Sequence, residues 1–343
     1  MKLEQRFDGR LACGTGLLCL ALLQSLTACA PPLTPVAETS INLSDSWQLA
    51  SSAAVAEAPA DISSPGYAAS GWTPTTVPST VLAALVRNGE YEEPYFARNL
   101  ETIPTERFEQ PWWYRTEFML DEPLPPGAQL VFEGINYRAD VWLNGQQIGT
   151  ADEIFGAFRM FEINIADHLQ SGVNAVAVLV YPPQPGDPSI GFVDWNPRPP
   201  DRNMGLWREV RLRLNGGIAL DNVFVHTDLD LETFATADLT IEATLRNETQ
   251  SPVKALFKGA IGNTMQFEQP IELAAGESRR VVLTPAELPQ LTLQQPRLWW
   301  PNNMGMPVLY QLDLGVGVGD AIADQHTLRF GVRHIGDYLT DDG

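Results

Sequence analysis

Between residues 194 and 208 the chain concentrates side chains that could bind a sugar. This stretch holds two aspartates, two tryptophans and three arginines. A carboxylate such as that of Asp194 can accept hydrogen bonds from two neighbouring hydroxyls, and an indole such as that of Trp195 can cover the apolar face of a pyranose. Three prolines restrict the backbone, so these side chains are partly ordered before a ligand arrives. The stretch therefore predicts a carbohydrate-binding loop.

Strand-like segments on either side must position this loop. Apolar and polar residues alternate with period two in 129–133, 138–144 and 210–214. Asn144-Gly145 ends the second of these segments and favours the positive φ angles of a type I′ hairpin. The one predicted helix runs from Thr80 to Asn88, where apolar residues recur at helical spacing. Residues 41–217 are therefore expected to form an antiparallel β-sandwich.

A second group of strand-like segments begins after Asn215-Gly216-Gly217, the expected domain boundary. Residues 239–245 alternate between apolar and polar side chains, which predicts one buried and one wet face. The other predicted strands are 222–227, 253–261, 278–283, 309–316 and 325–333. Six or seven short strands within residues 218–336 are typical of an immunoglobulin-like sandwich. The predicted fold class is all-β, with two sandwiches in sequence.

Length and charge limit the classes of function. A chain of 343 residues is long enough for two cores. Its formal net charge of -20 would repel polyphosphate backbones, so nucleic acid is excluded as an expected partner. The four histidines, His168, His226, His326 and His334, have no companion ligands at metal-binding spacing, so no metal site is expected.

The N-terminus has the features of an export signal. Lys2, Arg6 and Arg10 precede an apolar run that is too short to span a membrane. Residues 26–29 resemble the bacterial lipobox, in which the cysteine, here Cys29, is lipidated. Residues 1–28 are then a lipoprotein signal peptide and 29–40 a tether, with an ordinary cleaved signal peptide as the alternative. The expected location is the bacterial cell envelope, with the protein exported and lipid-anchored at the periplasmic or outer-membrane surface.

Several motifs in the first predicted sandwich carry a family resemblance. They are a Trp-Trp-Tyr-Arg strand at 112–115, an Asp-Val-x-Leu-Asn-Gly hairpin at 140–145, the segment 158–165 and a Gly-x-Asn strand at 172–178. In this order and spacing they resemble the sugar-binding domain of glycoside hydrolase family 2, over about residues 41–336. The resemblance implies a galactose-binding-like jelly-roll sandwich at 41–217, followed by the immunoglobulin-like sandwich at 218–336. The 194–208 loop is most similar to that of exo-β-glucosaminidases, with β-mannosidases close behind.

The resemblance also implies roles for individual residues. Asp194 would hold hydroxyls of the sugar that is cleaved, Trp195 would form a wall of its pocket, and Asn99 would reach the same subsite. The alternatives are that Asp194 caps a turn, that Trp195 and Trp207 pack the loop, and that Asn99 satisfies local backbone groups. Packing is the favoured role for Trp207. Asp201-Arg202 is expected to form an ion pair within the loop.

The residues that would break a glycosidic bond are not predicted in this sequence. Retaining glycosidases use two carboxylates about 5 Å apart, and in the resembled family both are glutamates on a (β/α)8 barrel, one of them in an Asn-Glu pair. The only such pair, Asn247-Glu248, falls in a predicted turn of the second sandwich. Residues 337–343 are expected to begin the missing barrel.

Together these observations predict the N-terminal, non-catalytic region of an exported retaining β-glycosidase, of the exo-β-D-glucosaminidase or β-mannosidase type, that helps form the substrate pocket. Its expected partners are a β-linked glucosamine or mannose oligosaccharide and the barrel of the same polypeptide, and the resemblance implies no organic cofactor. The membrane is contacted through the lipid anchor only. The alternative from a different class is a free-standing, carbohydrate-binding surface lipoprotein.

Overall fold

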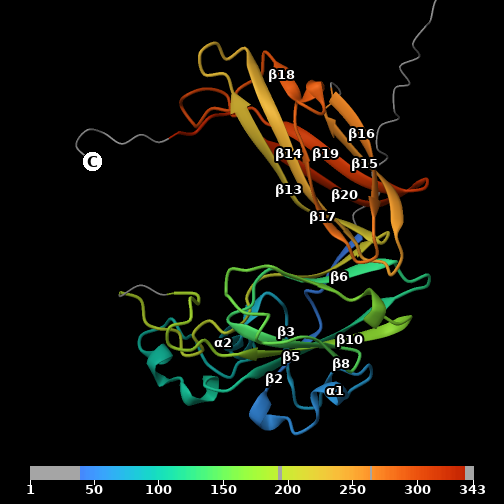
Figure 1. The fold of residues 1–343 in the computed structure, drawn as a ribbon. Helices are drawn as coiled ribbons and strands as arrows, with labels where there is room; N and C mark the ends of the chain where they lie inside the picture. The colour runs from blue at the N-terminus through green and yellow to red at the C-terminus, as the bar shows by residue number, and fades with distance from the viewer. Residues whose placement is uncertain (1–38, 192–194, 263–264, 337–343) are drawn as a thin grey trace, which may run out of the picture. The chain divides into compact units, whose positions relative to one another are not determined.

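The computed structural model describes residues 39–191, 195–262 and 265–336 (Figure 1). The predicted export signal, Cys29 and residues 29–38 of the tether lie outside these residues, as do Asp194 and 337–343. Within the described part, no helix is long and apolar enough to cross a membrane. Strands dominate the structure and form two sandwiches, which confirms the predicted all-β fold class.

The first sandwich packs a four-stranded sheet against a six-stranded sheet. The strand orders are β1-β12-β6-β9 and β3-β2-β5-β10-β7-β8, and a two-stranded ladder joins β11 to β4. The bounds are β1 Thr39–Asn42, β2 Trp47–Ser51, β3 Thr73–Thr75, β4 Ser79–Thr80, β5 Trp112–Leu120, β6 Gly127–Phe132, β7 Arg138–Leu143, β8 Gln146–Gly149, β9 Phe161–Asn164, β10 Gly172–Tyr181, β11 Gly205–Leu206 and β12 Val210–Asn215. Pairing between neighbours is antiparallel throughout, and Leu212 on β12 lies opposite Leu130 on β6, both fully buried.

Aromatic side chains fill the centre of this sandwich. Trp47 and Tyr114 are fully buried and meet edge to face, with ring centroids 6.5 Å apart. The indole N–H of Trp47 donates a hydrogen bond to the carbonyl of Leu43 at 2.7 Å, so its polar group stays paired inside the core. Burying these two large rings, on the neighbouring strands β2 and β5, stabilises the core of this domain.

The local predictions in this sandwich are confirmed. Helix α2, Val81–Arg87, has Thr80 as its N-cap and Asn88 as its C-cap, and the Thr80 hydroxyl accepts a hydrogen bond from Ala83 N–H at 3.2 Å. The hairpin between β7 and β8 turns at Asn144 and Gly145, whose φ angles are 50° and 85°. Helix α1, Pro59–Ile62, was not predicted, because a helix of four residues is too short for apolar periodicity to show.

The second sandwich also has two antiparallel sheets. Their strand orders are β13-β14-β17, with β18 also on β14, and β16-β15-β19-β20. The bounds are β13 Ile218–Leu229, β14 Thr236–Asn247, β15 Val253–Ile261, β16 Met265–Leu273, β17 Ser278–Leu283, β18 Thr292–Gln294, β19 Tyr310–Val318 and β20 Ala321–Phe330. The alternation predicted for 239–245 is present, with Leu239, Ile241 and Leu245 buried. Strands β16 and β18 were not predicted.

Candidate functional site

An open cleft of about 730 Å³ lies beside the loop that the sequence singled out. One wall is a side of α2 that carries Leu82, Ala83 and Val86. The segment 94–101 forms a second wall, and residues 191 and 196–203 of the loop form a third. The loop runs from the end of β10 at Tyr181 to the start of β11 at Gly205, and its described part contains no strand or helix. A long irregular loop beside a cleft is more often functional than idle.

Asp201 fastens the end of the loop to α2. Asp201 is 1% exposed, and its carboxylate accepts hydrogen bonds from Leu82 N–H at 2.9 Å and Asn203 N–H at 3.0 Å. Leu82 is the second residue of α2, so Asp201 pairs one of the amides that the first turn of a helix leaves without a partner. Burial raises the pKa of Asp201, while these hydrogen bonds oppose the shift. The Asp201 carboxylate therefore connects two walls of the cleft, the loop and α2.

Asn136 and Gly205 complete the base of the loop. The two residues exchange a pair of backbone hydrogen bonds, each of 2.9 Å. The side-chain amide of Asn136 donates to the carbonyls of Arg202 at 3.0 Å and Asn203 at 2.8 Å. Arg202 and Asn203 have positive φ angles of 52° and 58°, so the chain reverses sharply where Asn136 holds it. The last residues of the loop are thus fixed by bonds to the sandwich.

The expected ion pair between Asp201 and Arg202 is wrong. Among the described residues, the Arg202 guanidinium donates instead to the carbonyl of Pro183 at 2.8 Å, which ties the two ends of the loop together. Trp207, by contrast, has the packing role that was predicted. Its indole N–H donates to the carbonyl of Ala157 at 2.9 Å, and its ring meets Phe158 edge to face at 5.7 Å between centroids.

Two of the three predicted sugar-binding residues are described. Trp195 is 85% exposed, and the next two residues along the chain, Asn196 and Pro197, line the cleft. Asn99 begins a short 3-10 turn, and its side-chain amide donates to the carbonyls of Glu92 at 3.3 Å and Glu93 at 3.2 Å. This is the local bonding that the alternative interpretation of Asn99 expects. Asp194, the third, lies outside the described residues.

The structure adds residues that the sequence did not single out. Tyr95 is 96% exposed and Phe96 67% exposed, and Tyr95 lines the cleft. Arg98 and Glu101, also in its wall, form an exposed ion pair of 2.5 Å. The sequence did hold a signal for this wall of the cleft, since Tyr95 and Phe96 are adjacent aromatic residues in a segment without period-two alternation. Rings that no core buries can contact a ligand. Tyr95 and Phe96 on one segment and Trp195 on another therefore place exposed aromatic rings on two segments that line the cleft.

The described carboxylates of the cleft, Asp201 and Glu101, both have bonding partners within the chain. Both oxygens of Asp201 accept backbone hydrogen bonds, and Glu101 is held by Arg98 at the surface. Among the described residues, no three histidine, cysteine, aspartate or glutamate side chains lie close enough together to hold a metal ion. What this part of the cleft offers is amide groups, aromatic faces and an ion pair, which suit binding of a polar ligand with apolar faces.

Comparison with known proteins decides the family. A family model described as the glycosyl hydrolase 2 galactose-binding domain-like matches residues 47–188, and one described as glycosyl hydrolases family 2 matches residues 218–333. The chain belongs to glycosyl hydrolase family 2. Both predicted sandwich types, galactose-binding-like and then immunoglobulin-like, fit this family assignment.

Relatives of this family 2 chain are glycosidases. An exo-β-D-glucosaminidase of Streptomyces avermitilis is 39% identical over 87% of this chain and 33% of its own length. A mannosylglycoprotein endo-β-mannosidase of Lilium longiflorum is 30% identical over 79% of this chain and 31% of its own. A solved complex of Amycolatopsis orientalis exo-chitosanase CsxA with PNP-β-D-glucosamine is 35% identical, with a TM-score of 0.81 over 88% of this chain and 34% of that one. The chain thus spans about a third of the length of these relatives.

Proposed function

We propose that this chain is the N-terminal, non-catalytic region of a retaining family 2 β-glycosidase, and that its loop forms one wall of the substrate pocket. Asp194 would bind hydroxyls of the sugar, Trp195 would cover an apolar sugar face, and Asn99 would support the same subsite. The two glutamates that break the bond would belong to a barrel elsewhere in the same polypeptide. The polypeptide as a whole would remove terminal β-linked glucosamine or mannose units without an organic cofactor.

The observation that carries this proposal is the open cleft beside the loop. Its described part holds exposed rings and amide groups, both of its carboxylates have partners, and this chain spans only about a third of the length of its relatives. A wall of this kind binds a sugar weakly, because much of a buried ligand's surface must be covered from other sides. The glucosaminidase and mannosidase relatives support both candidate sugars.

We also propose that the chain is exported and lipid-anchored through Cys29 at the bacterial cell envelope. The support is the charged and apolar pattern of residues 1–29. Labelling with a radioactive palmitate precursor, compared with Cys29→Ser, tests it. Loss of label and release from the membrane fraction are expected for the variant, and equal labelling of both proteins would contradict the anchor.

Hydrolysis assays test the proposed role directly. The purified 343-residue chain is expected to release no nitrophenol from nitrophenyl β-glucosaminide or nitrophenyl β-mannoside, because neither catalytic glutamate is present. The matched control is a polypeptide in which the same chain is continued by the barrel of a relative, and this protein should turn over one of the two substrates. Turnover by the short chain alone would overturn the non-catalytic assignment.

Binding measurements separate the pocket-wall role from a free-standing lectin. Titration of chitosan and mannan oligosaccharides into the short chain should give weak or no binding. In the barrel-continued protein, Asp194→Ala should lower kcat/KM by roughly 10²-fold or more, since hydrogen bonds to the cleaved sugar strengthen in the transition state. Tight binding to the short chain that Asp194→Ala abolishes would favour the lectin instead.

A further inference from the structure

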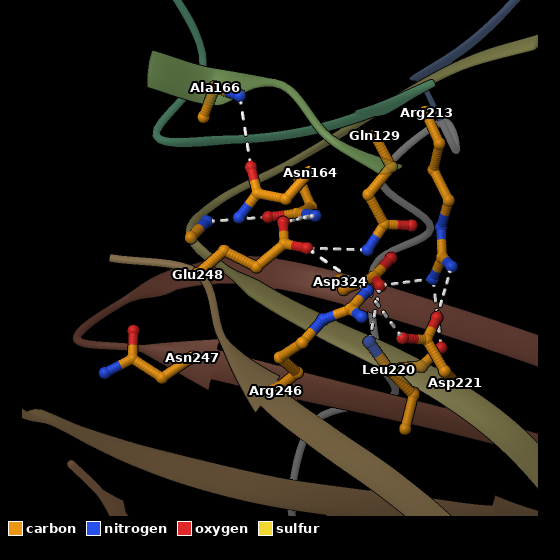
Figure 2. Close-up of polar contacts among 12 residues, drawn as sticks. Gln129, Asn164, Ala166, Arg213, Leu220, Asp221, Arg246, Asn247, Glu248 and Asp324 are labelled. Carbon is orange, nitrogen blue, oxygen red and sulfur yellow. Dashed lines mark hydrogen bonds and ion pairs between the residues drawn. The ribbon is translucent and has the colours of Figure 1, made fainter. Parts of the chain in front are cut away.

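A row of polar residues crosses the outer face of the β1-β12-β6-β9 sheet. The strand register places Arg213 of β12 beside Gln129 of β6, while Leu212 and Leu130 point into the core. The Arg213 guanidinium donates to Asp221 at 2.5 Å and to Asp324 at 2.5 Å, two carboxylates of the second sandwich (Figure 2). Arg213 therefore joins strands β12, β13 and β20 at one point.

Glu248 makes a second connection beside the first. Its side chain is 0% exposed. It accepts a hydrogen bond from the Gln129 amide at 2.6 Å (Figure 2) and another from the Asn215 amide at 2.8 Å, and both amides belong to the first sandwich. The Arg246 guanidinium lies 3.3 Å from Glu248 and 3.2 Å from Asp221, so it links the two connections. The Asn-Glu pair of the sequence thus has a structural position, with its carboxylate buried at the junction.

The charges at this junction do not balance. The charged groups that meet here are Glu162 of β9, Arg213 of β12, Asp221 of β13, Arg246 of β14, Glu248 of the turn after β14 and Asp324 of β20. Glu162 is exposed, so two guanidinium groups face three buried carboxylates and a fourth at the surface. A buried junction with surplus negative charge is stabilised when one carboxylate binds a proton.

We infer that docking of the second sandwich on the first is coupled to uptake of a proton by this junction of two arginines and four carboxylates. The proton binds chiefly to Asp324. Asp324 is 8% exposed. Its carboxylate contacts Arg213 and accepts hydrogen bonds from the backbone N–H groups of Leu220 at 2.8 Å and Gln325 at 2.9 Å. When the junction opens, Asp324 becomes hydrated and releases the proton.

The direction of the pH dependence follows from Asp324. Burial raises the pKa of this carboxyl to about 6, against an ordinary value of 3.8, although Arg213 and the N–H groups of Leu220 and Gln325 oppose the shift. The pKa of Glu162 is also raised, by desolvation and by the charge of Asp221. Because the pKa of Asp324 is higher in the closed state, proton binding stabilises that state. This stabilisation is complete below pH 3.8, the ordinary pKa, and is lost as the pH rises through about 6. Docking should therefore tighten between pH 7.5 and pH 4.5.

Hydrogen exchange on the purified full chain measures this opening. The amide of Gly216 donates to the carbonyl of Ala323, next to Asp324, at 2.7 Å. Its protection factor, corrected for the intrinsic pH dependence of exchange, should rise roughly 20-fold from pH 7.5 to pH 4.5. The amide of Gly89, which donates to the carbonyl of Val86 at 3.0 Å at the end of α2, should change less, because local opening there leaves Asp324 buried. A flat profile at Gly216, or equal changes at both amides, would overturn the inference.

Asp324→Asn identifies the group that binds the proton. The asparagine can still accept a hydrogen bond from Leu220 N–H but cannot titrate, so the rise at Gly216 should shrink to less than about threefold. Asp320→Asn is the matched control, since Asp320 is exposed in the turn between β19 and β20, and it should keep the wild-type profile. A full 20-fold rise in Asp324→Asn would overturn the assignment to Asp324. If this variant does not fold, the wild-type comparison of Gly216 with Gly89 still decides.

Discussion

Gly205→Ala is expected to lower the free energy of unfolding by about 3 kcal/mol or more. Gly205 has a φ angle of 146°, which L side chains rarely adopt. A Cβ at this position would lie 2.5 Å from the Tyr114 hydroxyl and 2.6 Å from the backbone carbonyl of Ser79. Because Ser79 belongs to β4, the backbone ladder between β11 and β4 would have to move. The C-terminal end of the loop should then detach from the sandwich.

Urea unfolding followed by tryptophan fluorescence measures the loss, because most tryptophans lie in the first sandwich. Gly191→Ala is the matched control in the same loop, since a Cβ there meets nothing within 4 Å. It should change stability by no more than about 0.5 kcal/mol. Proteolysis should also cut the loop faster in Gly205→Ala only. Equal unfolding midpoints for the two variants would contradict the steric argument.

Local chemistry made much of the fold predictable from the sequence. Strands β15 and β17 have the bounds that alternation predicted, 253–261 and 278–283, and Asn144-Gly145 forms the predicted turn. Alternation reports which face of a strand is buried, so it works where one face meets a core. Strand β16 was not predicted, because Pro270 and several polar residues interrupt its alternation. As an edge strand it tolerates a proline that a central strand would not.

The candidate site was only partly predictable, because its fastenings join residues far apart in the sequence. Asp201 was expected to pair with the adjacent Arg202, yet its partner Leu82 lies 119 residues away. Glu248 and Gln129 are likewise 119 residues apart. A single sequence shows that a carboxylate is present but not which distant amide will reach it once the sheets have packed. The loop was found by composition, whereas its attachment required the fold.

Asp201→Ala is expected to lower the free energy of unfolding by about 2–4 kcal/mol, since it leaves two buried N–H groups without an acceptor. The groups are those of Leu82 and Asn203, whose hydrogen bonds to the carboxylate measure 2.9 and 3.0 Å. Asp201→Asn should lose about half as much. The asparagine keeps one acceptor oxygen, but its NH₂ group must then face the other N–H donor. Hydrogen exchange at both amides should speed up in the alanine variant.

The comparison with an exposed carboxylate separates lost bonds from lost charge. Asp152→Ala removes the same charge from an exposed turn between β8 and β9 and should change stability by no more than about 0.5 kcal/mol. In a barrel-continued protein, Asp201→Ala should also lower kcat/KM toward nitrophenyl glycosides, because the loop that carries Trp195 would no longer be held against α2. If Asp201→Ala were as stable as Asp152→Ala, Asp201 would not be the fastening that joins the two walls of the cleft. If the stability fell and kcat/KM did not, the loop would be held at its base by Asp201 without serving the pocket.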